Sequence, residues 1–146
     1  MRVEESKYRN LYTKKGTVES GVFYFFEKFV IAEISERSTF QLGNSQRGNA
    51  IAYEHYGQDI RVAYISNRVN SYSVNAQDWL NFYKERHHLE AIAIVAYDKM
   101  GIMNVVLEKI FTQTRLRKFK NLDEAIAWVS LLKDSSEVEK TSQKDR

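Results

Sequence analysis

Two residue types are absent from this 146-residue chain, and each absence excludes a class of structure. Without cysteine, the protein cannot form disulfides, thiolate zinc sites, iron–sulfur clusters or a cysteine nucleophile. Without proline, it has neither Pro-rich linkers nor cis-prolyl turns. Glycine is scarce as well, since six residues are few for a cofactor-binding loop. A chain of this length can bury enough surface to fold on a hydrophobic core alone.

A strong excess of one charge and a long apolar run are also missing. The net charge of +3 is small for a dedicated nucleic-acid-binding protein. No stretch approaches the roughly 20 apolar residues of a membrane span, and residues 1–5 lack the apolar region of a signal peptide. We therefore expect a cytoplasmic protein with no membrane span and no nucleic-acid partner.

Sequence motifs of common catalytic sites are missing too. The chain has no Gly-x-Ser-x-Gly, no Gly-x-x-x-x-Gly-Lys-Ser/Thr, no Gly-x-Gly-x-x-Gly and no His-Glu-x-x-His. The sequence favours a binding or regulatory module over an enzyme, and it predicts no cofactor and no metal site.

Short apolar, β-favouring runs predict the strands. Two of them, at residues 22–26 and 29–34, flank Glu27 and Lys28 and predict a tight β-hairpin. Three more follow at residues 61–65, 91–97 and 116–119. The run at residues 91–97 is unbroken, which is typical of a central strand that is covered on both faces.

Four helical patterns alternate with these runs. One begins at Asn121, a suitable cap, and places Leu122, Ala125, Ile126, Val129 and Leu132 on one face. Others begin near Asn75 and at Asp98, and the weakest spans about residues 44 to 56, with Gly57 after its end. The helix near Asn75 carries Trp79, Leu80, Phe82 and Tyr83, and the helix after Asp98 is expected to use Ile102, Met103, Val106, Ile110 and Phe111 as its apolar face.

The order of these elements predicts an α/β fold. Strands that alternate with helices pair in parallel through right-handed crossovers. We expect an N-terminal hairpin followed by a mostly parallel sheet, with about five strands and four helices in all. Residues 1–16 are expected to form an arm or a weak first strand, residues 17–133 a single domain, and residues 134–146 a disordered polar tail.

Part of the sequence resembles the STAS or SpoIIAA-like fold of anti-sigma-factor antagonists and their relatives. The most specific piece is Leu116–Val129, in which a Phe precedes Leu-Asp-Glu-Ala and an aliphatic-Ala-Trp step. The segments at residues 23–29 and 65–74 resemble a group of short, uncharacterised bacterial proteins with this fold. The similarity covers roughly residues 18 to 132, and it implies a fold and a β-α superhelix but no activity.

In the antagonists, a regulatory serine stands within an Asp-Ser-Ser-Gly-like motif at the start of a helix. The resemblance assigns phosphorylation to Ser71. Here Asn70 replaces the aspartate, and Tyr72 stands where a small residue is usual. This departure argues against a kinase-regulated switch.

Two loops that follow neighbouring strands form the candidate site. Ligands of parallel sheets gather at the carboxyl ends of the strands, and both loops leave such an end. The loops supply hydroxyls, amides, an arginine and tyrosines that can bind an anion, or that can simply form turns and helix caps. The candidate residues are Ser66, Asn67, Arg68, Asn70, Ser71, Tyr72, Ser73, Tyr97 and Asp98.

Other clusters have ordinary structural explanations. His87 and His88 are adjacent, and adjacent helical residues point about 100° apart, which does not suit one metal ion. They follow Lys84 and Arg86 at a helix C-terminus, where positive charge is favourable. A second basic cluster, Arg115, Arg117, Lys118 and Lys120, fits either an acidic partner or the protection of an edge strand.

Three functions remain open. The first is a non-enzymatic STAS-like regulatory or binding module that engages a protein partner or small ligand at the carboxyl edge of the sheet. The second is a carrier of a small apolar or lipid-like ligand, for which the aromatic run Phe23–Phe26 offers a lining. The third is a phosphorylation-regulated anti-sigma-factor antagonist. The sequence leaves the oligomeric state open, with a homodimer among the alternatives.

Overall fold

The computed structural model describes residues 1–35, 39–40, 46–57, 62–70, 73–84 and 88–132. A short 3₁₀ helix at Val3–Glu5 comes first. The strands are β1 (Lys14–Val18), β2 (Gly21–Phe25), β3 (Phe29–Ile34), β4 (Thr39–Phe40), β5 (Ala63–Arg68), β6 (Ser73–Val74), β7 (Ile92–Ala96) and β8 (Leu116–Phe119). The helices are α1 (Gln46–Tyr56), α2 (Asp78–Lys84) and α3 (Lys99–Phe111), and residues 122–132 are helical as well. The α/β class predicted from the sequence is confirmed.

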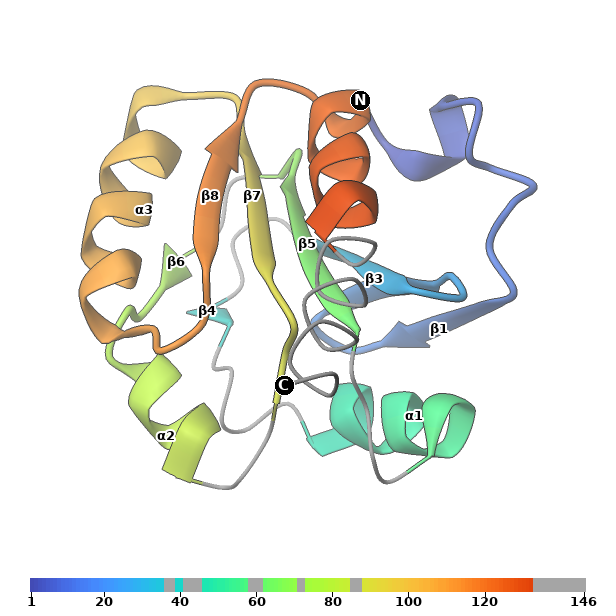
Figure 1. Cartoon of the computed structure of the whole chain (residues 1–146), viewed down its shortest axis with the longest axis horizontal. Coiled ribbons are helices and arrows are strands. Elements are labelled where there is room, and N and C mark those ends of the chain that lie inside the picture. Colours follow the sequence, from blue (N-terminus) through green and yellow to red (C-terminus); the bar gives the residue numbers. More distant parts are fainter. Residues whose placement is uncertain (36–38, 41–45, 58–61, 71–72, 85–87, 133–146) are drawn as a thin grey trace, which may run out of the picture.

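The main sheet has six strands in the order β1-β2-β3-β5-β7-β8 (Figure 1). β1, β2 and β3 pair in an antiparallel way, whereas β3, β5, β7 and β8 pair in parallel. The sheet is therefore mixed, with one strand more than the expected five. The additional strand is β1, which the sequence indicated only weakly because Gly16 is its one buried residue.

The predicted hairpin is β2 and β3. Residues 26–28 connect the two strands, and the Phe26 amide donates to the Phe29 carbonyl at 2.9 Å. At the other end of β2, Gly21 lies so close to β3 that a Cβ atom there would be 2.4 Å from the Glu33 carbonyl oxygen. Only glycine fits this position.

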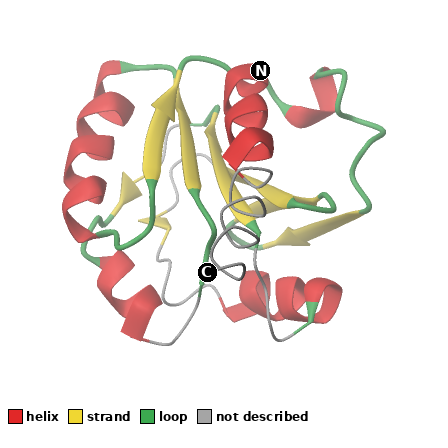
Figure 2. Ribbon diagram, viewed as in Figure 1, coloured by secondary structure: helices red, strands yellow, loops and turns green. Residues whose placement is uncertain are grey.

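Both faces of the sheet are covered, as the ribbon in Figure 2 shows. On one face α1, α2 and α3 pack on a core that includes Phe25, Trp79 and Ile94. On the other face the helix at residues 122–132 and the N-terminal segment pack on a core that includes Ile65 and Leu122. β7 is buried along its whole length, as the unbroken apolar run predicts for a central strand.

The predicted helices are present, with two differences. α2 begins at Asp78, three residues after Asn75, because residues 75–77 form a turn in which the Asn75 carbonyl accepts from the Asp78 amide. The expected apolar face of α3 is wrong. The residues that α3 buries are Val105 and Glu108, whereas Ile102, Met103, Val106 and Ile110 are exposed.

A second, smaller sheet consists of β4 and β6, which pair in parallel. Figure 1 shows it on the same side of the main sheet as α3. Within the described part of the chain, no helix has the length and apolar character that a membrane crossing requires. The polar tail predicted for residues 134–146 lies outside the described residues.

Candidate functional site

The candidate site lies where β5 and β7 end side by side. Their parallel register pairs Asn67 with Val95 and Arg68 with Ala96. The loops that follow therefore begin at the same edge, so that residues 66–70 and 97–98 come together as the sequence predicts. Ser71 and Tyr72 lie outside the described residues, and Ser73 belongs to β6. Phosphorylation of Ser71 stays a prediction.

Alternation along β5 directs two neighbouring polar side chains to opposite faces of the sheet. Asn67 is fully buried on the face covered by the N-terminal segment. Arg68 lies on the face covered by α2 and α3, where it contacts Glu108. The candidate site is thus split by the sheet into two clusters, which the linear sequence does not reveal.

The Asn67 cluster is closed by the protein's own N-terminal residues. The side-chain amide of Asn67 donates to Glu33 Oε2 and to the Met1 carbonyl, both at 2.8 Å. Tyr97 Oη donates to Asn67 Oδ1 at 2.8 Å, and the Val3 amide donates to Glu33 Oε2 at 2.8 Å. These polar groups satisfy one another, so the cluster ties residues 1–3 to the sheet edge.

Burial shapes the electrostatics of this cluster. Desolvation raises the pKa of Tyr97, and the negative charge of Glu33 raises it further. Tyr97 therefore remains a neutral donor toward Asn67 over the physiological pH range. The same cluster changes the description of the arm expected at residues 1–16. Residues 1–3 pack against the sheet edge, and Val3 is fully buried.

The second cluster is a buried ion pair between β5 and α3. Both terminal nitrogens of Arg68 bind the carboxylate of Glu108, at 2.7 and 2.8 Å, and Trp79 Nε1 donates to the same carboxylate at 3.1 Å. The side chains of Arg68 and Glu108 are 9% and 1% exposed. Arg68 was expected to offer its charge to an anion, but Glu108 balances that charge inside the protein.

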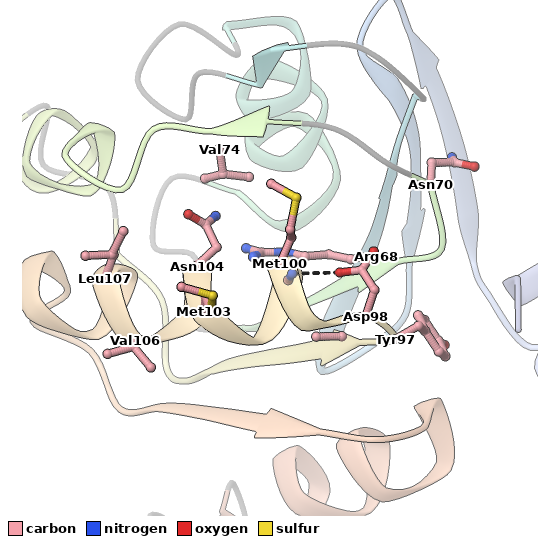
Figure 3. A pocket seen from close by; sticks show the side chains of 12 residues that line it. Arg68, Asn70, Val74, Tyr97, Asp98, Met100, Met103, Asn104, Val106 and Leu107 are labelled. Atoms are coloured by element: carbon pink, nitrogen blue, oxygen red, sulfur yellow. Dashed lines mark hydrogen bonds between the residues drawn. The ribbon is translucent and has the colours of Figure 1, made fainter.

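A groove lies above this ion pair, between α3 and β6, and its volume is about 580 Å³. Figure 3 shows Val74 of β6 on one side and the side chains of α3 on the other. We call it the α3–β6 groove. Its lining residues are Arg68, Asn70, Val74, Ala96, Tyr97, Asp98, Met100, Gly101, Met103, Asn104, Val106 and Leu107.

Two of the predicted polar residues at the groove have structural roles. Asp98 caps α3, since its carboxylate accepts from the Gly101 amide at 2.7 Å. Asn70 donates to the Ile34 carbonyl at 2.8 Å and accepts from Arg2 at 2.6 Å. Both interactions shape the rim of the groove.

The apolar wall of the groove is the feature that sequence reasoning missed. Met100, Met103 and Leu107 are 82%, 69% and 52% exposed. The sequence assigned Met103 and Val106 to the core and did not single out Met100 or Leu107. A signal was present, because eight of the 13 residues of α3 are large and apolar, which is more than one buried face can hold.

The remaining predicted clusters lie elsewhere. His87 is outside the described residues, and His88 is exposed. His55 lies 3.0 Å from Thr13 Oγ1, far along the chain from the other histidines. Among the described residues, no group of three or more His, Cys, Asp or Glu side chains is arranged to hold a metal ion.

We compared the chain with protein-family models, with curated proteins and with solved structures, and found no match.

Proposed function

We propose that this chain is a non-enzymatic, STAS-like binding module that engages a protein partner through the α3–β6 groove. One observation carries the proposal: an apolar wall, Met100, Met103 and Leu107, stands exposed beside a groove at the carboxyl ends of β5 and β7. Large exposed apolar patches with polar rims are typical of interaction sites. Methionine suits such a surface because its flexible side chain adapts to different partners.

The order of the elements supports the STAS-like part of the proposal. A hairpin, β2 and β3, precedes the parallel strands β5, β7 and β8. The segment Leu116–Val129 supplies the last strand and the start of a helix, with the Asn121 side chain accepting from the Glu124 amide at 2.9 Å. These are the features on which the resemblance rests.

The hydrogen bonding at the sheet edge supports a binding role over a catalytic one. Glu33, Asn67 and Tyr97 bond to one another and to the N-terminal backbone. Arg68 and Glu108 form a closed ion pair. A general acid or base needs a titratable group within reach of a substrate, and these groups are already engaged within the protein.

Affinity capture from the cells that make the protein tests the proposal. Three baits are compared by quantitative mass spectrometry: the wild-type chain, Met103→Glu in the groove wall, and Leu131→Glu as a matched control. Met103 and Leu131 are 69% and 67% exposed, so neither substitution disturbs the core. We expect proteins that are captured by the wild type and by Leu131→Glu, and at least tenfold less by Met103→Glu. Equal capture by all three baits would contradict the proposal.

A carrier of a small apolar ligand is the second candidate, and the volume of the groove favours it. About 580 Å³ is within the range of small-molecule sites. The aromatic run Phe23–Phe26 does not line this groove, because all four side chains are buried in the two cores. The apolar lining comes from α3 instead.

Native mass spectrometry of the purified protein distinguishes the two candidates. A carrier retains a small molecule of constant mass, and Met103→Trp, which fills the groove, removes that molecule. A docking module shows the mass of the chain alone. The second candidate fails if no adduct survives mild extraction.

A further inference from the structure

We propose that the partner segment is an acidic amphipathic helix that lies along α3, with its apolar side chains on α3 and its carboxylates near Lys99, Lys109 and Lys118. This inference rests on the proposed function and specifies the chemistry of the partner. It follows from the outward face of α3, from the charges around it and from the hollow beside it.

The outward face of α3 forms a continuous apolar stripe. Met100, Met103, Val106 and Ile110 follow one another at spacings of three or four residues, so they share one side of the helix. They are 62–82% exposed, and Leu107 adds to the same side at 52%. The 13 residues of α3 extend over about 20 Å, which matches about three to four turns of a second helix.

Three exposed lysines flank this stripe, and Asp98, the cap of α3, is the carboxylate that lines the groove. Lys99 and Lys109, both exposed, are the basic residues of α3. Lys118 of β8 is exposed on the sheet face that α3 covers, because it lies two residues after Leu116 and so shares a face with it, and Leu116 packs on the same core as α3. The acidic residue of α3, Glu108, is buried and bound to Arg68, so it does not offset these lysines.

A second copy of this chain fits the stripe less well than an acidic helix. In a two-fold pair with antiparallel copies of α3, Lys99 of one chain would lie near Lys109 of the other, and in a parallel pair each lysine would lie near its own copy. Like charges at an interface oppose association. Carboxylates on a partner helix would instead attract the lysines and orient the helix on α3.

The groove distinguishes a protein helix from a lipid surface. A bilayer contacts the protruding residues of an amphipathic helix and leaves the hollow between α3 and β6 unfilled. Side chains of a partner helix can enter the hollow beside Met100 and Leu107, which would bury these side chains completely. Helix-in-groove docking uses such anchors at spacings of three, four and seven residues.

Site-specific photo-cross-linking in the cells that make the protein tests the inference. A benzophenone amino acid replaces Val106 in the stripe or, as a control, Leu131, which has similar exposure on the helix at residues 122–132. The cross-linked peptides are sequenced. From Val106 we expect segments of another protein with net negative charge and apolar residues at helical spacing.

Charge reversal supplies an independent readout. The double variant Lys109→Glu and Lys118→Glu should lower the cross-linking yield at Val106 at least tenfold. The control Arg9→Glu and Lys28→Glu changes the net charge equally, at exposed positions in the N-terminal segment and the β2–β3 connection, and should leave the yield within twofold. A partner peptide with its acidic residues changed to lysine should bind the reversed variant better than the wild type.

The outcomes separate this inference from the proposed function. Partners that require Met103 but ignore the charge reversal would overturn the acidic helix and leave the docking module intact. Cross-links from Val106 to lipid or to a second copy of this chain would also overturn it. If Val106 gives no more cross-links than Leu131, and Met103→Glu changes no captured protein, both proposals fail.

Discussion

α3 and the helix at residues 122–132 begin alike, but α3 exposes most of its large apolar side chains and the other helix buries its core residues. Each follows a strand of the parallel part of the main sheet, and each starts at a side-chain cap, Asp98 or Asn121. In the helix at residues 122–132 the core residues Leu122, Ala125 and Val129 are 0–4% exposed. In α3, by contrast, most of the large apolar side chains face outward.

Two properties of α3 account for the difference: eight of its 13 residues are large and apolar, which is more than one buried face can hold, and its inner side carries a charged residue. Glu108 lies on the inner side of α3, where Arg68 and Trp79 bind its carboxylate. A carboxylate is buried only if it is paired, and the position of Arg68 on β5 fixes where that pairing occurs. Satisfying the ion pair therefore sets the rotation of α3 about its axis. Hydrophobic periodicity identifies residues that share a face but not the face that turns inward.

Among the substitutions that test this comparison, loss of the Arg68–Glu108 ion pair should lower the free energy of unfolding most. We expect Glu108→Ala to lower the free energy of unfolding by about 3–5 kcal/mol, because it leaves the Arg68 guanidinium buried without its partner. Urea denaturation followed by circular dichroism measures the loss. A loss below about 1 kcal/mol would contradict a stabilising role for the pair in the packing of α3.

The double variant Arg68→Met and Glu108→Gln is the control for this prediction. It removes both charges while a side-chain carbonyl remains for Trp79. Because no unpaired charge stays buried, the double variant should be more stable than Glu108→Ala.

A cavity in the core beneath the helix at residues 122–132 should lower the free energy of unfolding by nearly as much. Leu122 is fully buried against the core beneath residues 122–132, so Leu122→Ala should lower the free energy of unfolding by about 2–5 kcal/mol. The same denaturation assay measures it. For comparison, Leu131→Ala on the exposed side of that helix should change the free energy of unfolding by less than about 0.5 kcal/mol.

Local signals predicted the elements well where they depend on neighbours in the sequence. The apolar runs identified β2, β3, β5, β7 and β8, and polar side chains identified the caps at Asp98 and Asn121. These features are fixed by alternation and by short-range hydrogen bonds. β1 gave a weak signal, since an edge strand with one buried residue has no clear alternation.

The candidate site was less predictable because it depends on contacts between distant residues. The sequence predicted that residues 66–70 and 97–98 lie at one edge of the sheet. It did not show that Glu108, 40 residues after Arg68, would balance the charge of the Arg68 guanidinium. It also did not show that the backbone of Met1 and Val3 would close the Asn67 cluster. Pairing across such separations is a property of the tertiary structure.

The two caps should contribute equally, which sharpens the comparison. Asp98→Ala and Asn121→Ala each remove one acceptor from a first-turn amide, and each should lower the free energy of unfolding by about 1 kcal/mol. Denaturation of the two variants side by side measures the effects. A difference well above 1 kcal/mol would indicate that one helix depends on its cap more than its packing suggests.

High pH should act on the contact between the N-terminal segment and the helix at residues 122–132. Burial raises the pKa of Tyr8 to about 12, and its hydrogen bond to Asp123 adds to the effect. The folded state then holds the phenol proton above pH 10, where the unfolded chain releases it, so stability falls as the pH rises from about 10 to 12. Tyr8→Phe should show a shallower fall over this range. An identical slope in both proteins would rule out a contribution from Tyr8.

The smallest effect on the free energy of unfolding is expected for substitutions in the apolar stripe of α3. Met103 is 69% exposed, so Met103→Ser removes little buried apolar surface and should change the free energy of unfolding by less than about 0.5 kcal/mol. A helix whose apolar residues are kept for folding would instead lose stability on such a change, as Leu122→Ala does. The same variant should reduce partner capture, because Met103 lines the α3–β6 groove. Denaturation and partner capture, measured on one preparation, test the two expectations. A clear loss of stability would mean that Met103 packs inside the protein. The outward face of α3 would then not be a docking surface.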